Sequence, residues 1–164
     1  MASIPSSSSP THEWKYDVFI SFRGEDTRAT FTDHLYNCLV ERGISTFTDD
    51  EKLELGTPIG PELLKAVEQS RFAVVILSRN YASSRWCLTE LAEIVACKKR
   101  TGLVVLPVFY DVDPSDVRKQ KGIYAEAFKE HEERFKDSNK EVVHMWKAAL
   151  TEVANLPGWY LGDR

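Results

Sequence analysis

The hexapeptide Phe72-Ala73-Val74-Val75-Ile76-Leu77 is apolar at every position. A strand without polar alternation is typical of a parallel sheet whose two faces are both covered. Residues 16–21 and 103–110 have a similar character, although Pro107 predicts a bulge or a position near a sheet edge. Segments with helical periodicity separate these strands. The alternation predicts an α/β domain with a mostly parallel sheet and helices on both faces.

Turn residues and apolar periodicity predict the remaining elements. Gly43 ends a helix that places Phe31, Leu35, Cys38 and Leu39 on one face. The other expected elements are a strand at 44–47, a loop at 48–60, a helix at 61–69, helical pieces between 111 and 132 broken by Pro114 and Gly122, a helix from about 139 with Val142, Trp146, Ala149, Leu150 and Val153 on one face, and a weakly signalled fifth strand at 158–161.

Residues 83–100 predict a helix with serines at its start and three basic residues at its end. On a helical wheel, Glu90 falls within the apolar face, flanked by Trp86 and Ile94, whereas Glu93 falls on the polar face. A carboxylate on the apolar face loses hydration, which costs free energy unless the group is paired or neutralised. Two interpretations are open. Glu90 is either a structural residue satisfied by an arginine or a backbone N–H, or a functional carboxylate held in a cleft.

The expected sheet also indicates where a ligand binds. In open parallel sheets, ligands bind at the carboxyl ends of the strands, beside the point where the strand order reverses. In the flavodoxin-like order, this point lies between the first and third strands. Residues 22–24 and 78–80 leave these two ends, and the second segment leads into the helix that carries Glu90. Two separate patterns therefore indicate the same region.

Composition restricts the class of protein. The 164 residues suit one domain, with 43% hydrophobic and 28% charged residues, and the net charge of −4 argues against nucleic-acid binding. Three cysteines match neither a zinc site nor a disulfide framework and favour a reducing compartment. No apolar run reaches the roughly 18 residues of a membrane span, and the N-terminus lacks signal-peptide features. We expect a protein of the cytoplasm or nucleus, without membrane or metal, and with a disordered tail at 1–14.

Motifs of several other α/β proteins are absent from the sequence. It contains no GxxxxGK[ST], no GxGxxG after a strand and no GxSxG. A phospho-acceptor receiver would need an aspartate at the end of the third strand, where this chain has Ser78. We expect His131 and His144 to be surface residues, because neither lies near an obvious nucleophile.

Residues 17–28 (DVFISFRGEDTR), 84–91 (SRWCLTEL) and 107–118 (PVFYDVDPSDVR) occur in this order. Together they resemble the signature motifs of plant TIR domains, the signalling domains of a class of intracellular nucleotide-binding, leucine-rich-repeat (NLR) disease resistance proteins. The resemblance implies a flavodoxin-like fold with five strands. It also implies a TIR domain at 15–161 and, at 162–164, the start of a linker to downstream receptor domains.

The resemblance implies that this domain cleaves NAD⁺, or NADP⁺, at the nicotinamide–ribose bond and so triggers defence and cell death. No bound cofactor or metal is implied. The essential carboxylate of the Trp-Cys-Leu-x-Glu-Leu motif corresponds here to Glu90. Trp86 either walls the substrate or only packs in the core, and Arg23 either meets a phosphate or pairs with the acidic residues at 49–51. The expected substrate-binding residues are Phe22, Arg23, Gly24, Ser84 and Trp86, and the loop at 48–60 resembles the loop that gates the pocket.

The resemblance also implies self-association. A Ser-His pair on the first helix is usual at one symmetric interface, with the last helix alongside, and this chain has Asp33 and His34 there. Two Asp33 carboxylates across a two-fold axis would repel, which predicts a weaker contact. A second interface is expected from the last helix and the region of Lys119, Lys121 and Gly122. The alternative function is a non-catalytic TIR–TIR scaffold that recruits partners.

Overall fold

The computed structural model describes residues 14–48 and 60–162. Its sheet consists of β1 (Tyr16–Ser21), β2 (Thr46–Thr48), β3 (Ser70–Leu77), β4 (Val104–Tyr110) and β5 (Trp159–Leu161). The strand order is β2-β1-β3-β4-β5 and every pairing is parallel. This order confirms the flavodoxin-like α/β fold. The second strand begins two residues later than expected, and Ser45, just before it, donates its N–H to the Asp17 carboxylate.

The helices begin and end at residues suited to those positions. Ser84 caps α4 by accepting a hydrogen bond from the Cys87 N–H at 3.1 Å, and Gly102 ends that helix with φ +81°. Asp113 and Asn139 cap α5 and α7 in the same manner. The helices are α1 (Gly24–Thr27), a π-helical turn (Arg28–Thr32) leading into α2 (Asp33–Glu41), α3 (Pro61–Glu68), α4 (Arg85–Thr101), α5 (Pro114–Lys119), α6 (Ile123–Phe135) and α7 (Lys140–Ala154).

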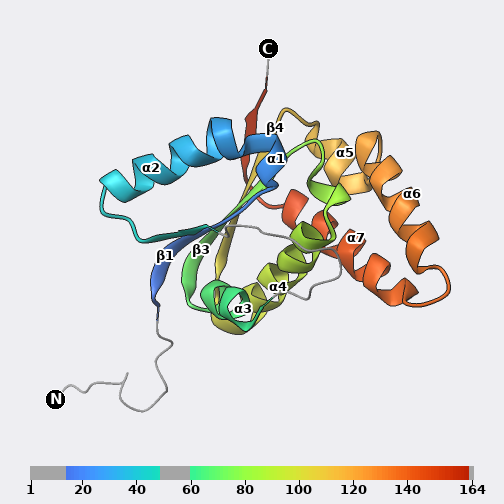
Figure 1. Ribbon diagram of the computed structural model, residues 1–164, viewed down its shortest axis with the longest axis horizontal. Helices are drawn as coiled ribbons and strands as arrows, with labels where there is room; N and C mark the ends of the chain where they lie inside the picture. Colours follow the sequence, from blue (N-terminus) through green and yellow to red (C-terminus); the bar gives the residue numbers. More distant parts are fainter. Residues whose placement is uncertain (1–13, 49–59, 163–164) are drawn as a thin grey trace.

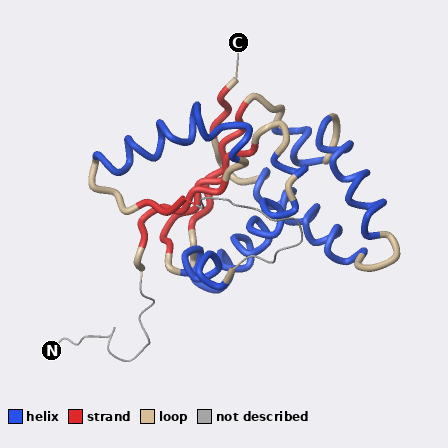
Figure 2. Tube along the Cα trace, in the orientation of Figure 1, coloured by secondary structure: helices blue, strands red, loops and turns tan. Residues whose placement is uncertain are grey.

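The sheet separates two unequal layers. Helix α2 lies on one face, and α3 to α7 lie on the other (Figures 1 and 2). The larger core fills the second face, where Phe19 and Leu77 of the sheet meet Leu91 of α4 and Leu150 of α7. A smaller core lies under α2 and contains Ile20, among others. Helices thus pack on both faces, as the apolar strands predict.

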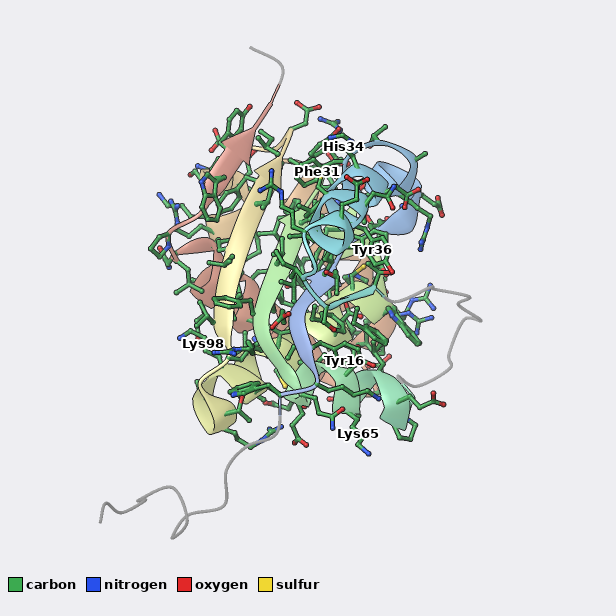
Figure 3. The ribbon with its side chains drawn as sticks, turned by 90° about the vertical axis from the view of Figure 1, so that its left-hand side faces the viewer. Tyr16, Phe31, His34, Tyr36, Lys65 and Lys98 are labelled. Carbon is green, nitrogen blue, oxygen red and sulfur yellow. The ribbon has the colours of Figure 1, made fainter. Side chains whose placement is uncertain are left out.

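The smaller layer covers only part of its face. Phe31 of the π-helical turn and His34 of α2 lie toward the carboxyl ends of the strands, Tyr16 lies toward the opposite end, and Tyr36 of α2 lies between them (Figure 3). Large apolar side chains outside this cover remain accessible, with 38% of Phe72, 46% of Val104 and 57% of Trp159 exposed. No helix in the described part of the chain is both long and apolar enough to cross a membrane.

Three details of the predicted pattern need comment. Cys38, expected on the apolar face of its helix, is exposed and lies near His34 instead. Pro107 lies in β4, which is next to the edge strand β5, and just before the residues of β4 that pair with β5. This is a position near the sheet edge, as expected. The prediction of a surface His131 is wrong, because this side chain is buried between the Phe128 and Trp146 rings.

Candidate active site

The candidate site is built where β1 and β3 end side by side. Ser21 is in register with Val75, so the segments that follow these strands leave the sheet at the same edge. The connections leave β1 and β3 in opposite directions along the sheet, which makes this edge the topological switch point. Helix α1 starts directly after β1, and α4 follows β3 after a short connection.

Helix α4 holds Glu90 in a buried position. Only 2% of Glu90 is exposed, and Ile94 on the same face is fully buried. Trp86, one turn earlier, is half-buried and packs against the larger core. The first turn of α4 contacts the end of β1, since the Cys87 thiol donates to the Phe22 carbonyl at 3.6 Å. Glu90 therefore lies on the inner face of α4, one turn beyond the contact with β1.

A buried hydroxyl connects the two strand ends. Tyr81 donates its hydroxyl to the Cys87 carbonyl at 3.2 Å, so Ser21 donates to Tyr81 across 2.8 Å. Burial raises the pKa of Tyr81 well above its ordinary value. The charges of Cys87 and Glu90, when these groups are ionised, raise the pKa of Tyr81 further. Burial likewise raises the pKa of Tyr124. The interior beside Glu90 is thus a poorly hydrated environment.

The raised pKa values predict a loss of stability at alkaline pH. In the unfolded chain Tyr81 and Tyr124 release their protons near pH 10, whereas in the folded protein they keep them. The free energy of unfolding should therefore be unaffected by these groups below about pH 10 and fall above it, by about 1.4 kcal/mol per group for each further pH unit. Urea unfolding at pH 8 and at about pH 11 measures the difference.

Absorbance at 295 nm provides the control for this prediction. The native-state ionisation amplitude should be the same in the parent, Tyr81→Phe and Tyr124→Phe up to about pH 11, because neither hydroxyl ionises while folded. In urea, each variant should lose the amplitude of one tyrosine. A native amplitude that is smaller in either variant would show that the replaced hydroxyl ionises in the folded protein.

Asp26 joins the two segments that form the site. Its carboxylate accepts hydrogen bonds from the Ser78 hydroxyl at 2.6 Å, the Asn80 backbone N–H at 2.9 Å and the Asn80 side-chain amide at 3.2 Å. Arg23 lies 3.6 Å from the same carboxylate and 3.6 Å from that of Glu25. Among the described residues, the Arg23 Nε is buried and has no hydrogen-bond acceptor. Asp26 thus orients Arg23 and fixes the start of the connection to α4.

The other predicted substrate-binding residues have different positions. The Phe22 ring is buried in the core under α2, with the Arg28 guanidinium over it, and the Phe22 carbonyl accepts a hydrogen bond from α4. Gly24 starts α1, and a side chain there would approach the Arg28 guanidinium to 3.2 Å. Ser84 uses its hydroxyl for the cap of α4. The structure therefore brings Arg23, Ser84, Trp86 and Glu90 to one end of the sheet but directs the Phe22 ring away from it.

The predicted self-association residues are accessible but divided between two faces. Asp33 and His34 are exposed on α2, and Lys119, Lys121 and Gly122 are exposed around the junction of α5 and α6. Helix α7 packs on the sheet face opposite α2 (Figure 1). The expectation that the last helix lies alongside the first in one interface is therefore wrong for α7. Its position beside α5 remains compatible with the second expected interface.

Several expectations concern residues outside the described ranges. The tail at 1–13 and the residues 49–59 of the expected gating loop belong to this group, so the alternative pairing of Arg23 with residues 49–51 lies outside the description. Within residues 14–48 and 60–162, no group of three or more histidine, cysteine, aspartate or glutamate side chains is arranged to hold a metal ion.

Sequence patterns did not identify Asp26, Tyr81, Tyr124 or His131 as parts of this region. Asp26 lies in the first turn after β1, near the switch point, but so does the exposed Glu25, and the sequence pattern does not distinguish the two. The two tyrosines and His131 carry no comparable signal, since their partners are main-chain carbonyls between 6 and 49 residues away.

Comparison with known proteins gives a consistent result. The TIR domain family model matches residues 15–163. TMV resistance protein N of Nicotiana glutinosa is 57% identical over 152 residues, which cover 93% of this chain and 13% of that protein. Disease resistance protein RPV1 of Vitis rotundifolia is 58% identical over 148 residues, which cover 90% of this chain and 10% of that protein. This chain thus spans about one-tenth of the length of these relatives.

A solved structure agrees with the sequence comparisons. The TIR domains in the activated Roq1 resistosome, which directly recognises the pathogen effector XopQ, are 55% identical to this chain. They superpose with a TM-score of 0.82, covering 89% of this chain and 87% of that one.

Proposed function

This chain belongs to the TIR domain family, and from that premise we propose that it cleaves NAD⁺, or NADP⁺, at the bond between nicotinamide and ribose. The observation that carries the proposal is Glu90, a buried carboxylate on α4 at the switch point of the sheet. A buried carboxylate beside the switch point of such a sheet is a candidate for catalysis. We propose further that this reaction serves plant immune signalling, since the similar proteins are disease resistance proteins.

In the proposed reaction, the bond between the ribose C1′ and the nicotinamide nitrogen breaks, and its electron pair leaves with nicotinamide as a neutral base. Positive charge develops on the ribose, as in other glycosyl transfers. Water then adds to C1′ and releases a proton, which gives ADP-ribose. The Glu90 carboxylate stabilises the charged transition state more than the ground state, and the poorly hydrated surroundings strengthen this interaction.

Other residues at the same edge would bind the substrate. Arg23 has a guanidinium suited to a diphosphate, and Asp26 holds it beside the end of β1. Trp86, half-buried one turn before Glu90, presents an aromatic surface that a base can stack on. Ser84 keeps the start of α4 in place through its capping bond. We assign no resident cofactor to the site, because NAD⁺ is the substrate.

Assembly is the second part of the proposal. The Roq1 TIR domains belong to an activated resistosome, and we infer homotypic contacts here through α2, with Asp33 and His34, and through Lys119, Lys121 and Gly122. The exposure of these residues also favours the alternative of a non-catalytic interaction scaffold. In either role the domain would act with downstream receptor domains in the cytoplasm or nucleus, without membrane or nucleic acid as a partner.

The experiment that separates these functions is NAD⁺ cleavage as a function of protein concentration. If assembly completes the site, nicotinamide release should rise with about the square of the protein concentration at low concentration and become linear once the protein is assembled. Light scattering on the same samples reports assembly. A folded protein that assembles without releasing nicotinamide would support the scaffold and contradict the enzyme, whereas strictly linear release at every concentration would contradict assembly dependence.

A further inference from the structure

The connection from β3 to α4, residues 78–84, sets the position of the catalytic helix. It consists of Ser78, the turn at Arg79 and Asn80, the 3₁₀ turn Tyr81–Ser83, and the cap Ser84. Ser84 donates its N–H to the Tyr81 carbonyl at 3.2 Å and then caps α4 through its hydroxyl. Any displacement of this connection therefore moves the first turn of α4, and Trp86 and Glu90 with it.

Helix α6 holds this connection through two buried hydrogen bonds. The Tyr124 hydroxyl donates to the Ser78 carbonyl at 2.6 Å. The His131 Nε2 lies 2.7 Å from the Ala82 carbonyl, and because a carbonyl only accepts, Nε2 carries the proton. Tyr124 and His131 are seven residues apart on α6 and so project from the same side of the helix. Their two acceptors lie near the opposite ends of the connection.

The environment of His131 fixes both the protonation and the orientation of the imidazole that makes this bond. Burial lowers the pKa of His131, so that the neutral imidazole is favoured, although the bond to Ala82 acts in the opposite direction. The Phe128 and Trp146 rings meet the imidazole edge-on, with centroids 5.7 and 5.2 Å away. The ring is thus fixed in orientation by packing as well as by its hydrogen bond.

The same connection is held from the opposite direction by Asp26. The Ser78 hydroxyl and the Asn80 N–H both donate to its carboxylate. Ser78 therefore meets α1 through its side chain and α6 through its carbonyl. The connection is fixed between two helices that do not themselves carry Glu90.

We propose that Tyr124 and His131 are positioning residues for NAD⁺ cleavage: their bonds to Ser78 and Ala82 fix the connection that places Glu90. The inference rests on the proposed function, because it concerns the catalytic geometry of that site. Small displacements of a catalytic group cost large factors in rate, so loss of either bond should lower turnover in addition to its effect on stability. Neither residue contacts the substrate in this proposal.

Three variants and one control test this role. Tyr124→Phe and His131→Phe keep the ring and remove the donor, while His131→Gln keeps an N–H donor at similar reach. Val153→Ala trims a buried side chain of α7 in the same core and serves as a control for lost stability. Kinetics are measured at a temperature at which every variant is fully folded. We expect kcat/KM to fall about tenfold in both Phe variants, with kcat falling more than KM rises, and to recover in His131→Gln.

Hydrogen exchange of the amides between Tyr81 and Leu88 tests the connection without reference to activity. Protection there should fall in Tyr124→Phe and His131→Phe but not in Val153→Ala. Unchanged protection in both Phe variants, or kcat/KM values equal to that of Val153→Ala, would overturn the positioning role. If the parent protein does not cleave NAD⁺, the proposed function fails, and the exchange data alone decide whether α6 holds the connection.

Discussion

Replacing Glu90 by glutamine is expected to lower kcat for NAD⁺ cleavage by about 10²–10³-fold. The substitution keeps the size of the side chain and removes the negative charge that would stabilise the positive charge on the ribose. Because this interaction strengthens in the transition state, kcat should fall far more than KM changes. Nicotinamide release measured by chromatography at saturating NAD⁺, with assembled protein, gives the ratio.

Glu93→Gln is the matched control for this experiment. Glu93 lies three residues later on α4, and its replacement by glutamine removes the same charge. Its side chain is only partly buried, and its carboxylate lies 3.3 Å from the Arg100 guanidinium, outside the candidate site. We expect its kcat within about twofold of the parent and a stability loss below about 1 kcal/mol. Circular dichroism at the assay temperature checks that both variants are folded, so that a difference in kcat reports the change at Glu90 and not unfolding. If Glu90→Gln and Glu93→Gln had the same kcat, Glu90 would have no role in the mechanism.

The features predicted correctly from the sequence depend on local pattern. The apolar runs gave the strands, and their alternation with helices gave the parallel sheet, because both depend only on periodicity along the chain. Glu90 was placed on the buried face of its helix by the same argument. The position of the Phe22 ring could have been predicted in the same way, since Phe22 follows Ile20 by two residues and so faces the same side of the sheet.

The features that were missed depend on contacts between distant segments. His131 lies in a helix with many charged residues, and only its meeting with Trp146 and the Ala82 carbonyl, 49 residues away, explains its burial. Asp26 likewise finds its partners at Ser78 and Asn80 only after β1 and β3 pair. The separation of α2 from α7 follows from right-handed crossovers that run in opposite directions from β1 and from β4, which requires the strand order to be known.

Asp26→Ala is expected to lower the free energy of unfolding by about 3 kcal/mol and to abolish measurable NAD⁺ cleavage. The substitution leaves the Ser78 hydroxyl and the Asn80 N–H without their acceptor, and only 13% of the Asp26 side chain is exposed to water that could replace it. Of its two ion-pair partners among the described residues, Arg23 keeps Glu25 and loses Asp26, which orients it. Urea unfolding measures the first effect, and nicotinamide release well below the unfolding transition measures the second.

Glu25→Ala separates the role of Asp26 from simple charge pairing. Glu25 lies at the same distance from Arg23, but 81% of its side chain is exposed and it contacts neither Ser78 nor Asn80. Its loss should change stability by less than about 0.5 kcal/mol and leave cleavage within about twofold of the parent. If Asp26 acted only through Arg23, the two alanine variants would have similar kcat/KM, and the hydrogen bonds to the 78–84 connection would be irrelevant to catalysis. A kcat/KM that is much lower in Asp26→Ala than in Glu25→Ala would instead show that the geometry of this connection controls the placement of Glu90.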